Sequence, residues 1–184
     1  MATPPDFTAG QVLTAAQMNL AGSWVVKRDT IASGASSATI SAAFNADFTH
    51  YRVLIHNMSV AAGTPNLLFQ LRTGSTTANT NYFWGGTNSN YLGRTDENSS
   101  GTTSSWKVGA VTTAATGSCD VMIYRPFDAA VTNYYGTCVA GNVASYQIGG
   151  THNTATSYDQ LVISLSTATT FNATATVIII GMRD

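Results

Sequence analysis

Short runs of β-branched and aromatic residues recur from residue 24 to the end of the chain, separated by clusters of Gly, Asn, Ser and Pro. This pattern is typical of strands joined by turns, and no helix is needed to account for it. Several short strands at this spacing predict an all-β fold, an antiparallel β-sandwich or jelly-roll-like domain. Strands are expected at Trp24–Ile31, Ala38–Ser41, Tyr51–Met58, Leu67–Thr73, Trp106–Val108, Cys119–Arg125, Tyr134–Ala140, Ser145–Gly149, Gln160–Leu165 and Thr174–Met182.

Within these runs apolar and polar residues alternate, as in strands that bury one face. Tyr51, Val53 and Ile55 are expected to share the buried face of their strand. The last strand differs, because residues 177–180 are apolar on both faces. Such a strand is either central and covered twice, or it meets another subunit. In the second case Ile178 and Ile180 would lie at the subunit interface.

The first 22 residues follow another pattern. Residues 2–10 contain two of the four prolines and are expected to form an extended arm. Thr14 followed three residues later by Gln17 is a capping-box pattern, which predicts one short helix between Thr14 and Ala21. A helix this short is marginal alone and needs a surface on which to dock. The chain is thus expected to divide into an arm with a short helix, residues 1–22, and one β-sandwich domain, residues 23–184.

Residues 74–105 lose the strand pattern and become rich in Thr, Asn, Ser and Gly, which predicts a long loop or irregular excursion. This segment nevertheless carries four large aromatic residues: Tyr82, Phe83, Trp84 and Tyr91. They could form a platform that stacks on the sugar rings of a glycan, or a patch that binds a partner protein. The alternative, which we favour, is a small apolar core that holds the loop on the sheet. The paired glycines at 85–86 and 149–150 are interpreted as turn glycines.

Charged residues make up only 9% of the 184 residues, against roughly 25% in ordinary soluble domains. Lys27 and Lys107 are the only lysines, and Glu97 is the only glutamate. A surface with so few charges is well suited to contact with other protein copies, because few charges lose water when it is covered. The alternative is an ordinary Thr-rich β-sheet surface, and composition does not separate the two.

The formal net charge is −1 and no basic run occurs, so the charge pattern of a nucleic-acid-binding protein is missing. The longest apolar run, residues 177–180, is far too short to span a bilayer, and no membrane insertion is expected. The start of the chain lacks the features of an export signal. Cys119 and Cys138 are therefore expected to be buried free thiols. A disulfide between neighbouring strands is the alternative, if the two side chains face each other.

The sequence contains little material for catalysis. His50 and His56 are expected on one face of a strand but ~20 Å apart, so they cannot ligate the same metal ion. The acidic residues show no spacing typical of a glycosidase pair, and no nucleophile, zinc or phosphate-binding motif occurs. We expect no enzymatic activity, no metal site and no cofactor.

One segment resembles a known group of proteins. Residues 5–19, Pro-Asp-Phe-Thr-Ala-Gly-Gln-Val-Leu-Thr-Ala-Ala-Gln-Met-Asn, resemble the opening segment common among tail, fibre and head-decoration proteins of tailed bacteriophages. In those proteins a variable β-rich part follows the segment. The ending, residues 170–182, is also similar to the closing strand of many phage sandwich domains.

The resemblance implies a virion structural protein, such as a capsid decoration (cement) protein or a tail-associated protein, made in the host cytoplasm and released by lysis. Its expected partners are its own copies, as a homotrimer, and other virion proteins. The alternative is a receptor- or carbohydrate-binding module of a phage tail, and a glycan-degrading tailspike enzyme is the least favoured. Anchoring to the virion would use the large apolar residues of the arm: Phe7, Val12, Leu13, Met18 and Leu20.

Overall fold

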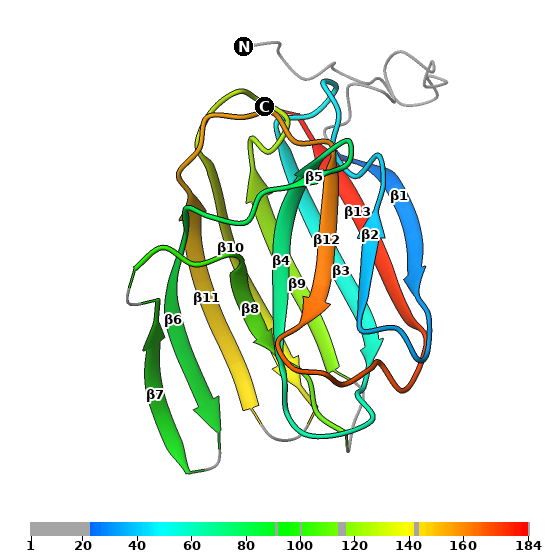
Figure 1. Ribbon diagram of the computed structural model, residues 1–184, viewed down its shortest axis with the longest axis vertical. Helices are drawn as coiled ribbons and strands as arrows, with labels where there is room; N and C mark the ends of the chain where they lie inside the picture. Colours follow the sequence, from blue (N-terminus) through cyan, green and yellow to red (C-terminus); the bar gives the residue numbers. More distant parts are fainter. Residues whose placement is uncertain (1–22, 91, 100, 114–116, 142–143, 184) are drawn as a thin grey trace, which may run out of the picture.

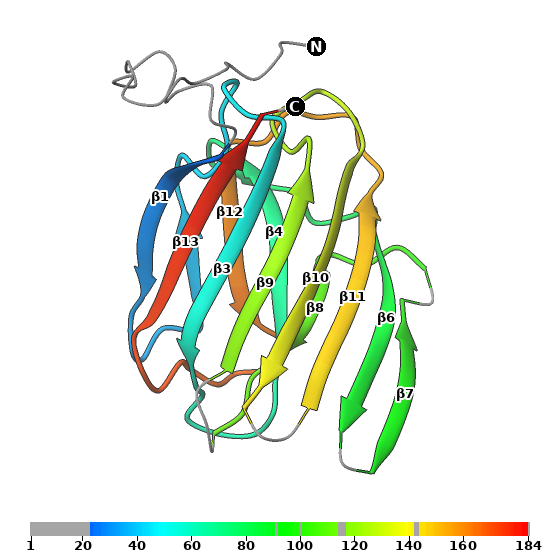
Figure 2. The same cartoon turned by 180° about the vertical axis from the view of Figure 1, so that it is seen from behind.

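The computed structural model describes residues 23–90, 92–99, 101–113, 117–141 and 144–183. Its strands form two antiparallel sheets packed face to face (Figures 1 and 2). The eight-stranded sheet has the order β1-β13-β3-β9-β10-β11-β6-β7, and the five-stranded sheet has the order β2-β12-β4-β5, with β8 also paired to β4. The described residues contain no helix, and the predicted all-β antiparallel sandwich is confirmed.

The strands are β1 (Ser23–Ile31), β2 (Ser37–Ile40), β3 (His50–Met58), β4 (Asn66–Thr73), β5 (Thr76–Thr77), β6 (Tyr82–Asn90), β7 (Gly93–Asn98), β8 (Trp106–Ala110), β9 (Gly117–Tyr124), β10 (Thr132–Ala140), β11 (Ala144–His152), β12 (Gln160–Leu165) and β13 (Ala175–Met182).

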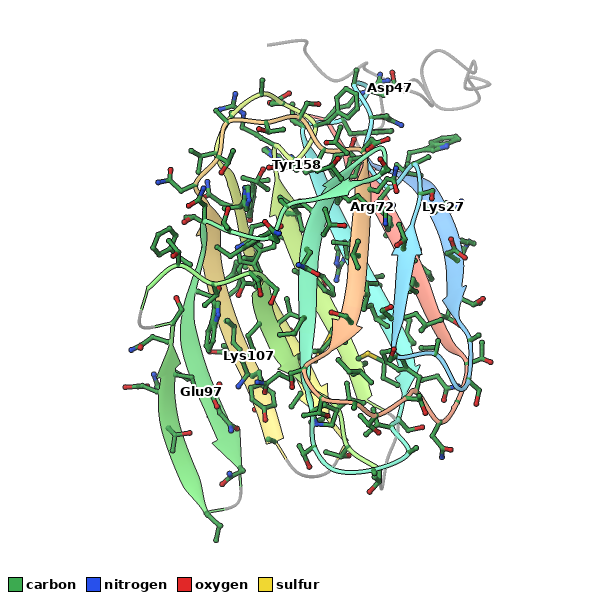
Figure 3. The ribbon with its side chains drawn as sticks, viewed as in Figure 1. Lys27, Asp47, Arg72, Glu97, Lys107 and Tyr158 are labelled. Carbon is green, nitrogen blue, oxygen red and sulfur yellow. A yellow bond between two sulfur atoms is a disulfide. The ribbon has the colours of Figure 1, made fainter. Side chains whose placement is uncertain are left out.

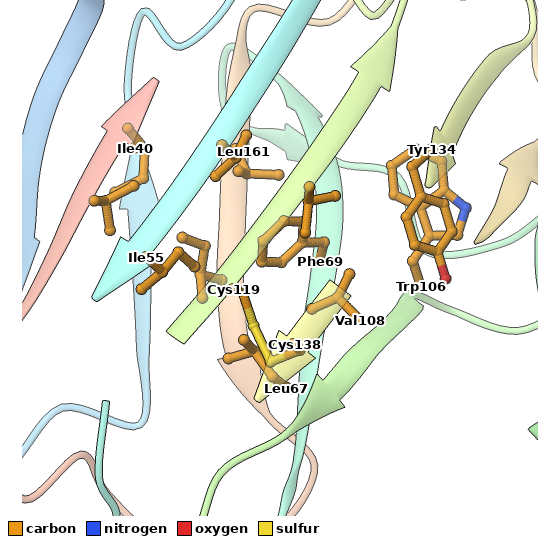
Figure 4. Packing of buried hydrophobic residues seen from close by; sticks show 14 of the residues in the cluster. Ile40, Ile55, Leu67, Phe69, Trp106, Val108, Cys119, Tyr134, Cys138 and Leu161 are labelled. Atoms are coloured by element: carbon orange, nitrogen blue, oxygen red, sulfur yellow. A yellow bond between two sulfur atoms is a disulfide. The ribbon is translucent and has the colours of Figure 1, made fainter. Parts of the chain in front are cut away.

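The core lies between the two sheets and is built by residues two apart along each strand. Tyr51, Val53 and Ile55 of β3 are fully buried, as their alternation predicts. Figure 4 shows this layer, with Phe69 from the five-stranded sheet and Tyr134 from the eight-stranded sheet. Burial of one large apolar side chain contributes about 1.5–3 kcal/mol. The sandwich therefore has a continuous core that holds both sheets together.

The prediction of a long loop at residues 74–105 is wrong. This segment contains β5, β6 and β7, and β6 pairs with all nine residues of β11. β6 and β7 form a hairpin at one edge of the eight-stranded sheet, beyond the five-stranded sheet that covers the rest of the inner face (Figure 2). Because little packs on the inner face of β7, its residues need not be apolar, and the alternation that marks a strand is lost.

The glycine pairs are not turn glycines, because both lie within strands. Gly85 pairs with Gly149, and Gly150 pairs with Trp84. A Cβ atom on Gly86 would lie 2.1 Å from the carbonyl oxygen of Gln147, so β6 and β11 approach each other too closely for a side chain there. Glycine thus permits the close strand pairing that carries the β6–β7 hairpin.

The two cysteines form a disulfide, and the expectation of free thiols is wrong. Cys119 on β9 and Cys138 on β10 are directly opposite each other, with both side chains buried on the inner face of the sheet. This is the facing arrangement that the alternative required. Gly109 of β8 lies against the disulfide, and a Cβ atom there would be 2.6 Å from the sulfur of Cys138.

The predicted helix between Thr14 and Ala21 and the predicted anchoring residues lie outside the described residues, as does Tyr91. The anchoring residues are Phe7, Val12, Leu13, Met18 and Leu20. No helix in the described part of the chain is long and apolar enough to cross a membrane.

Candidate functional site

The face of the eight-stranded sheet that points away from the core is a candidate binding surface, and we call it the outer face. Its apolar members come from β1, β3, β6, β9, β10 and β13 and are all at least partly exposed. They are Val25, Leu54, Phe83, Met122, Tyr124, Tyr135, Val139, Ile178, Ile180 and Met182. Tyr135 is the most exposed of them, with 53% of its surface in solvent.

The strand register aligns several of these side chains across the sheet. Val25 lies opposite Ile180, Ile180 opposite Arg52, Arg52 opposite Met122, and Met122 opposite Tyr135. One row of neighbouring positions therefore crosses five strands and contains a single charged residue. Side chains directly opposite on adjacent strands are close enough to form one continuous surface.

The one charge in that row is compensated within the same face. The guanidinium group of Arg52 donates from Nε to Oδ1 of Asp120 at 2.8 Å, and its second nitrogen bonds Oδ2, which makes a two-point ion pair. Hydrogen bonding to Arg52 lowers the pKa of the Asp120 carboxyl below its ordinary value. The pair stays ionised at neutral pH, so the centre of the outer face carries no net charge from it.

The predicted interface residues Ile178 and Ile180 lie on this outer face. Strand β13 is flanked by β1 and β3, so it is next to the edge of the sheet rather than at its centre. The inward side chains Val177 and Ile179 are fully buried, whereas Ile178 and Ile180 are only half-buried. Among the described residues, the apolar run is thus fully covered on one face alone.

The aromatic residues of β6 do not form a single platform. Tyr82 is fully buried and its ring packs against Trp106 and His152, with centroids 5.3 and 4.3 Å away. Phe83, the next residue, points to the outer face and is 37% exposed, while Trp84 points inward. Tyr82 therefore belongs to the core, as the favoured interpretation of these aromatics supposes, and stacking of all of them on one glycan has no structural basis.

The ring of Trp84 instead lies beside an ion pair on the inner side of the sheet. Lys107 of β8 bonds Glu97 of β7, and the two side chains are only 8% and 23% exposed. The ammonium group lies 5.7 Å from the ring centroid of Trp84 and 5.3 Å from that of Tyr146. This cluster, Lys107 with Glu97, Trp84 and Tyr146, joins the β6–β7 hairpin to the five-stranded sheet. Nothing in the sequence pattern points to this cluster except the rarity of its charged residues, since Glu97 is the only glutamate and Lys107 is one of two lysines.

The three histidines lie in two places. His50 and His56 share the outward side of β3, as their spacing predicts, and His152 is buried at the end of β11. Within the described ranges, no group of three or more His, Cys, Asp or Glu side chains could hold a metal ion.

Comparisons of the chain with family models, with curated proteins and with solved structures gave no match.

Proposed function

We propose that this chain is a non-enzymatic structural component of a tailed-bacteriophage virion, and that it works by assembly with copies of itself. The sandwich would contact its own copies through the outer face, and residues 1–22 would attach it to other virion proteins. The resemblance of residues 5–19 to phage virion proteins supplies the class of particle. The observation that carries the assembly proposal is the aligned, half-exposed apolar row that crosses five strands of the outer face.

A second copy is the occupant that best fits this face. The Arg52–Asp120 pair neutralises itself, so the face does not require a partner of opposite charge. Apart from this pair the face carries few charges, Arg28 among them, so contact between two such faces loses little hydration of charges, which otherwise opposes association. Each apolar side chain contributes about 1.5–3 kcal/mol when fully buried, so covering Tyr135, Met122 and Ile180 would support a stable contact. The resemblance further implies a homotrimer.

The oligomeric state tests this proposal. The substitution Tyr135→Glu places a charge at the β10 end of the row, at a position where the side chain is already half in solvent. Light scattering is expected to show an oligomer for the natural chain and a monomer for the variant, and circular dichroism is expected to show the same β-sheet spectrum for both, because the substitution removes only the contact between copies. Thr39→Glu is the matched control, because Thr39 is exposed on the five-stranded sheet, on the opposite side of the sandwich. A natural chain that is monomeric at high concentration would overturn the assembly proposal.

The particle itself tests the virion assignment. Mass spectrometry of purified phage particles is expected to find this chain in a fixed copy number per virion. A high copy number indicates a capsid decoration or tail-tube role, and a low copy number indicates a receptor-binding role. Absence of the chain from the particles would contradict the assignment without bearing on self-association.

A further inference from the structure

We infer that a pocket at one end of the sandwich is a binding site for a neutral saccharide. This inference goes beyond the proposed assembly function and does not depend on it. The pocket has a volume of about 320 Å³ and lies between the β4–β6 connection and the β11–β12 loop. Figure 3 places Tyr158, which lines it, toward one end of the molecule, far along the sandwich from Lys107.

The chemistry of the walls selects the class of ligand. The lining consists of six threonines, two asparagines, Ala78, His152 and Tyr158, and none of these described lining residues is Asp, Glu, Lys or Arg. A charged ligand would lose water without gaining an opposite charge, and an apolar ligand would leave the hydroxyl and amide groups unpaired. Hydroxyl and amide side chains both donate and accept hydrogen bonds, as the hydroxyl groups of a sugar do. A neutral polyhydroxylated ligand is therefore the one that satisfies this lining.

Two of the lining residues carry rings that are almost fully buried, so they shape the wall of the pocket rather than offer a surface for stacking. His152 is 1% exposed and Tyr158 is 4% exposed, and the tyrosine hydroxyl lies 3.5 Å from Nδ1 of the histidine. Their ring planes are perpendicular, with centroids 5.3 Å apart. Burial lowers the pKa of His152, so its ring is uncharged at neutral pH.

The walls are held in place by bonds between the two loops. The backbone N–H of Asn153 donates to the carbonyl of Asn81 at 2.9 Å, and the Asn81 amide donates to the Thr154 hydroxyl at 3.1 Å. Farther along, the Thr73 hydroxyl donates to the carbonyl of Ser157. A pocket fixed before the ligand arrives loses less conformational entropy on binding. Its volume, near the lower end of the roughly 300–1,000 Å³ range of ligand sites, fits one sugar unit or the end of a glycan.

Two variants each remove one polar group from the pocket lining with little strain. Asn81 has φ of +63°, so Asn81→Gly deletes the amide while keeping a residue that accepts this backbone conformation. Thr154→Val replaces the hydroxyl by a methyl group of the same shape. Thr137→Val is the matched control, because Thr137 is exposed on the outer face at mid-strand. Thermal melting of each variant checks that the fold is retained.

The test is ligand-observed NMR on the full chain with glucose, galactose, mannose and N-acetylglucosamine, and with glucuronic acid and inorganic phosphate as charged probes. At least one neutral sugar is expected to bind at millimolar concentration, with affinity lowered roughly threefold to tenfold in each pocket variant and unchanged in Thr137→Val. The inference is overturned if none of the four sugars binds, if the charged probes bind more tightly, or if both folded pocket variants bind as the natural chain does. Because oligomeric state is measured separately, failure here leaves the assembly proposal standing.

Discussion

The ion pair between Lys107 and Glu97 is predicted to contribute more to stability than any exposed pair in this chain. Lys107 projects from the five-stranded sheet and Glu97 from the edge hairpin of the other sheet, so the bond spans the two layers. With side-chain exposures of 8% and 23%, the pair lies between a buried pair and a surface pair. Breaking a fully buried pair costs about 3–5 kcal/mol, whereas an exposed pair contributes at most about 1 kcal/mol.

The two single substitutions are expected to differ. Lys107→Met keeps the aliphatic stem but removes the ion pair and both contacts with the faces of Trp84 and Tyr146, so it should lower the free energy of unfolding by about 2–3 kcal/mol. Glu97→Gln leaves the ammonium group between the same two rings, which still attract it, and should cost about 1–2 kcal/mol. The double variant leaves no unpaired charge, so its cost should be at least about 1 kcal/mol smaller than the sum of the two.

Urea denaturation followed by circular dichroism measures all three variants. Asp96→Asn is the matched control, because Asp96 lies on the same strand as Glu97 but is 82% exposed, and its pair with Arg94 has an N–O distance of 3.7 Å. Its cost should stay below about 0.5 kcal/mol. The reasoning is refuted if Lys107→Met costs no more than Asp96→Asn, or if the two single effects simply add in the double variant.

Three further predictions concern the core, pH and the arm. Gly109→Ala should destabilise the fold by about 1–3 kcal/mol in thermal or urea unfolding, because the added methyl group would meet Cys138 at 2.5 Å, and a neutral effect would contradict this packing. The pKa of His152 is lowered by burial, so below about pH 6.5 the unfolded chain binds more protons than the folded chain does. Stability should therefore fall as the pH falls through that range, by at most about 1.4 kcal/mol per pH unit, and this slope should shrink in His152→Gln. Deleting residues 2–21 should leave the melting temperature nearly unchanged and abolish incorporation into particles; unfolding of the truncated protein, or its normal incorporation, would refute anchoring by the arm.

The strands that bury one face between the two sheets were predictable from sequence. In β12, and in β3 from Tyr51 to Ile55, every second residue is apolar and buried, so the alternation of apolar and polar residues marks both strands. The disulfide was not decided at that stage, because it depends on the register between β9 and β10. That register places Cys119 directly opposite Cys138, and a shift of one residue would have turned one sulfur to the other face of the sheet.

The β6–β7 hairpin and the outer face escaped prediction for related reasons. Alternation along a strand reports only that one face is buried, and the hairpin lies beyond the sheet that would bury it, so Gly85 and Gly86 read as a turn. On the outer face, Ile178 and Ile180 stood out because they interrupt an alternating pattern, whereas Tyr135 did not, since one exposed aromatic residue in a strand is ordinary. Only the cross-strand register shows that Tyr135 continues the row from Ile180. A surface that depends on five strands far apart in sequence has no signature in any one of them, and this is why the row on the outer face is recognised only in the folded chain.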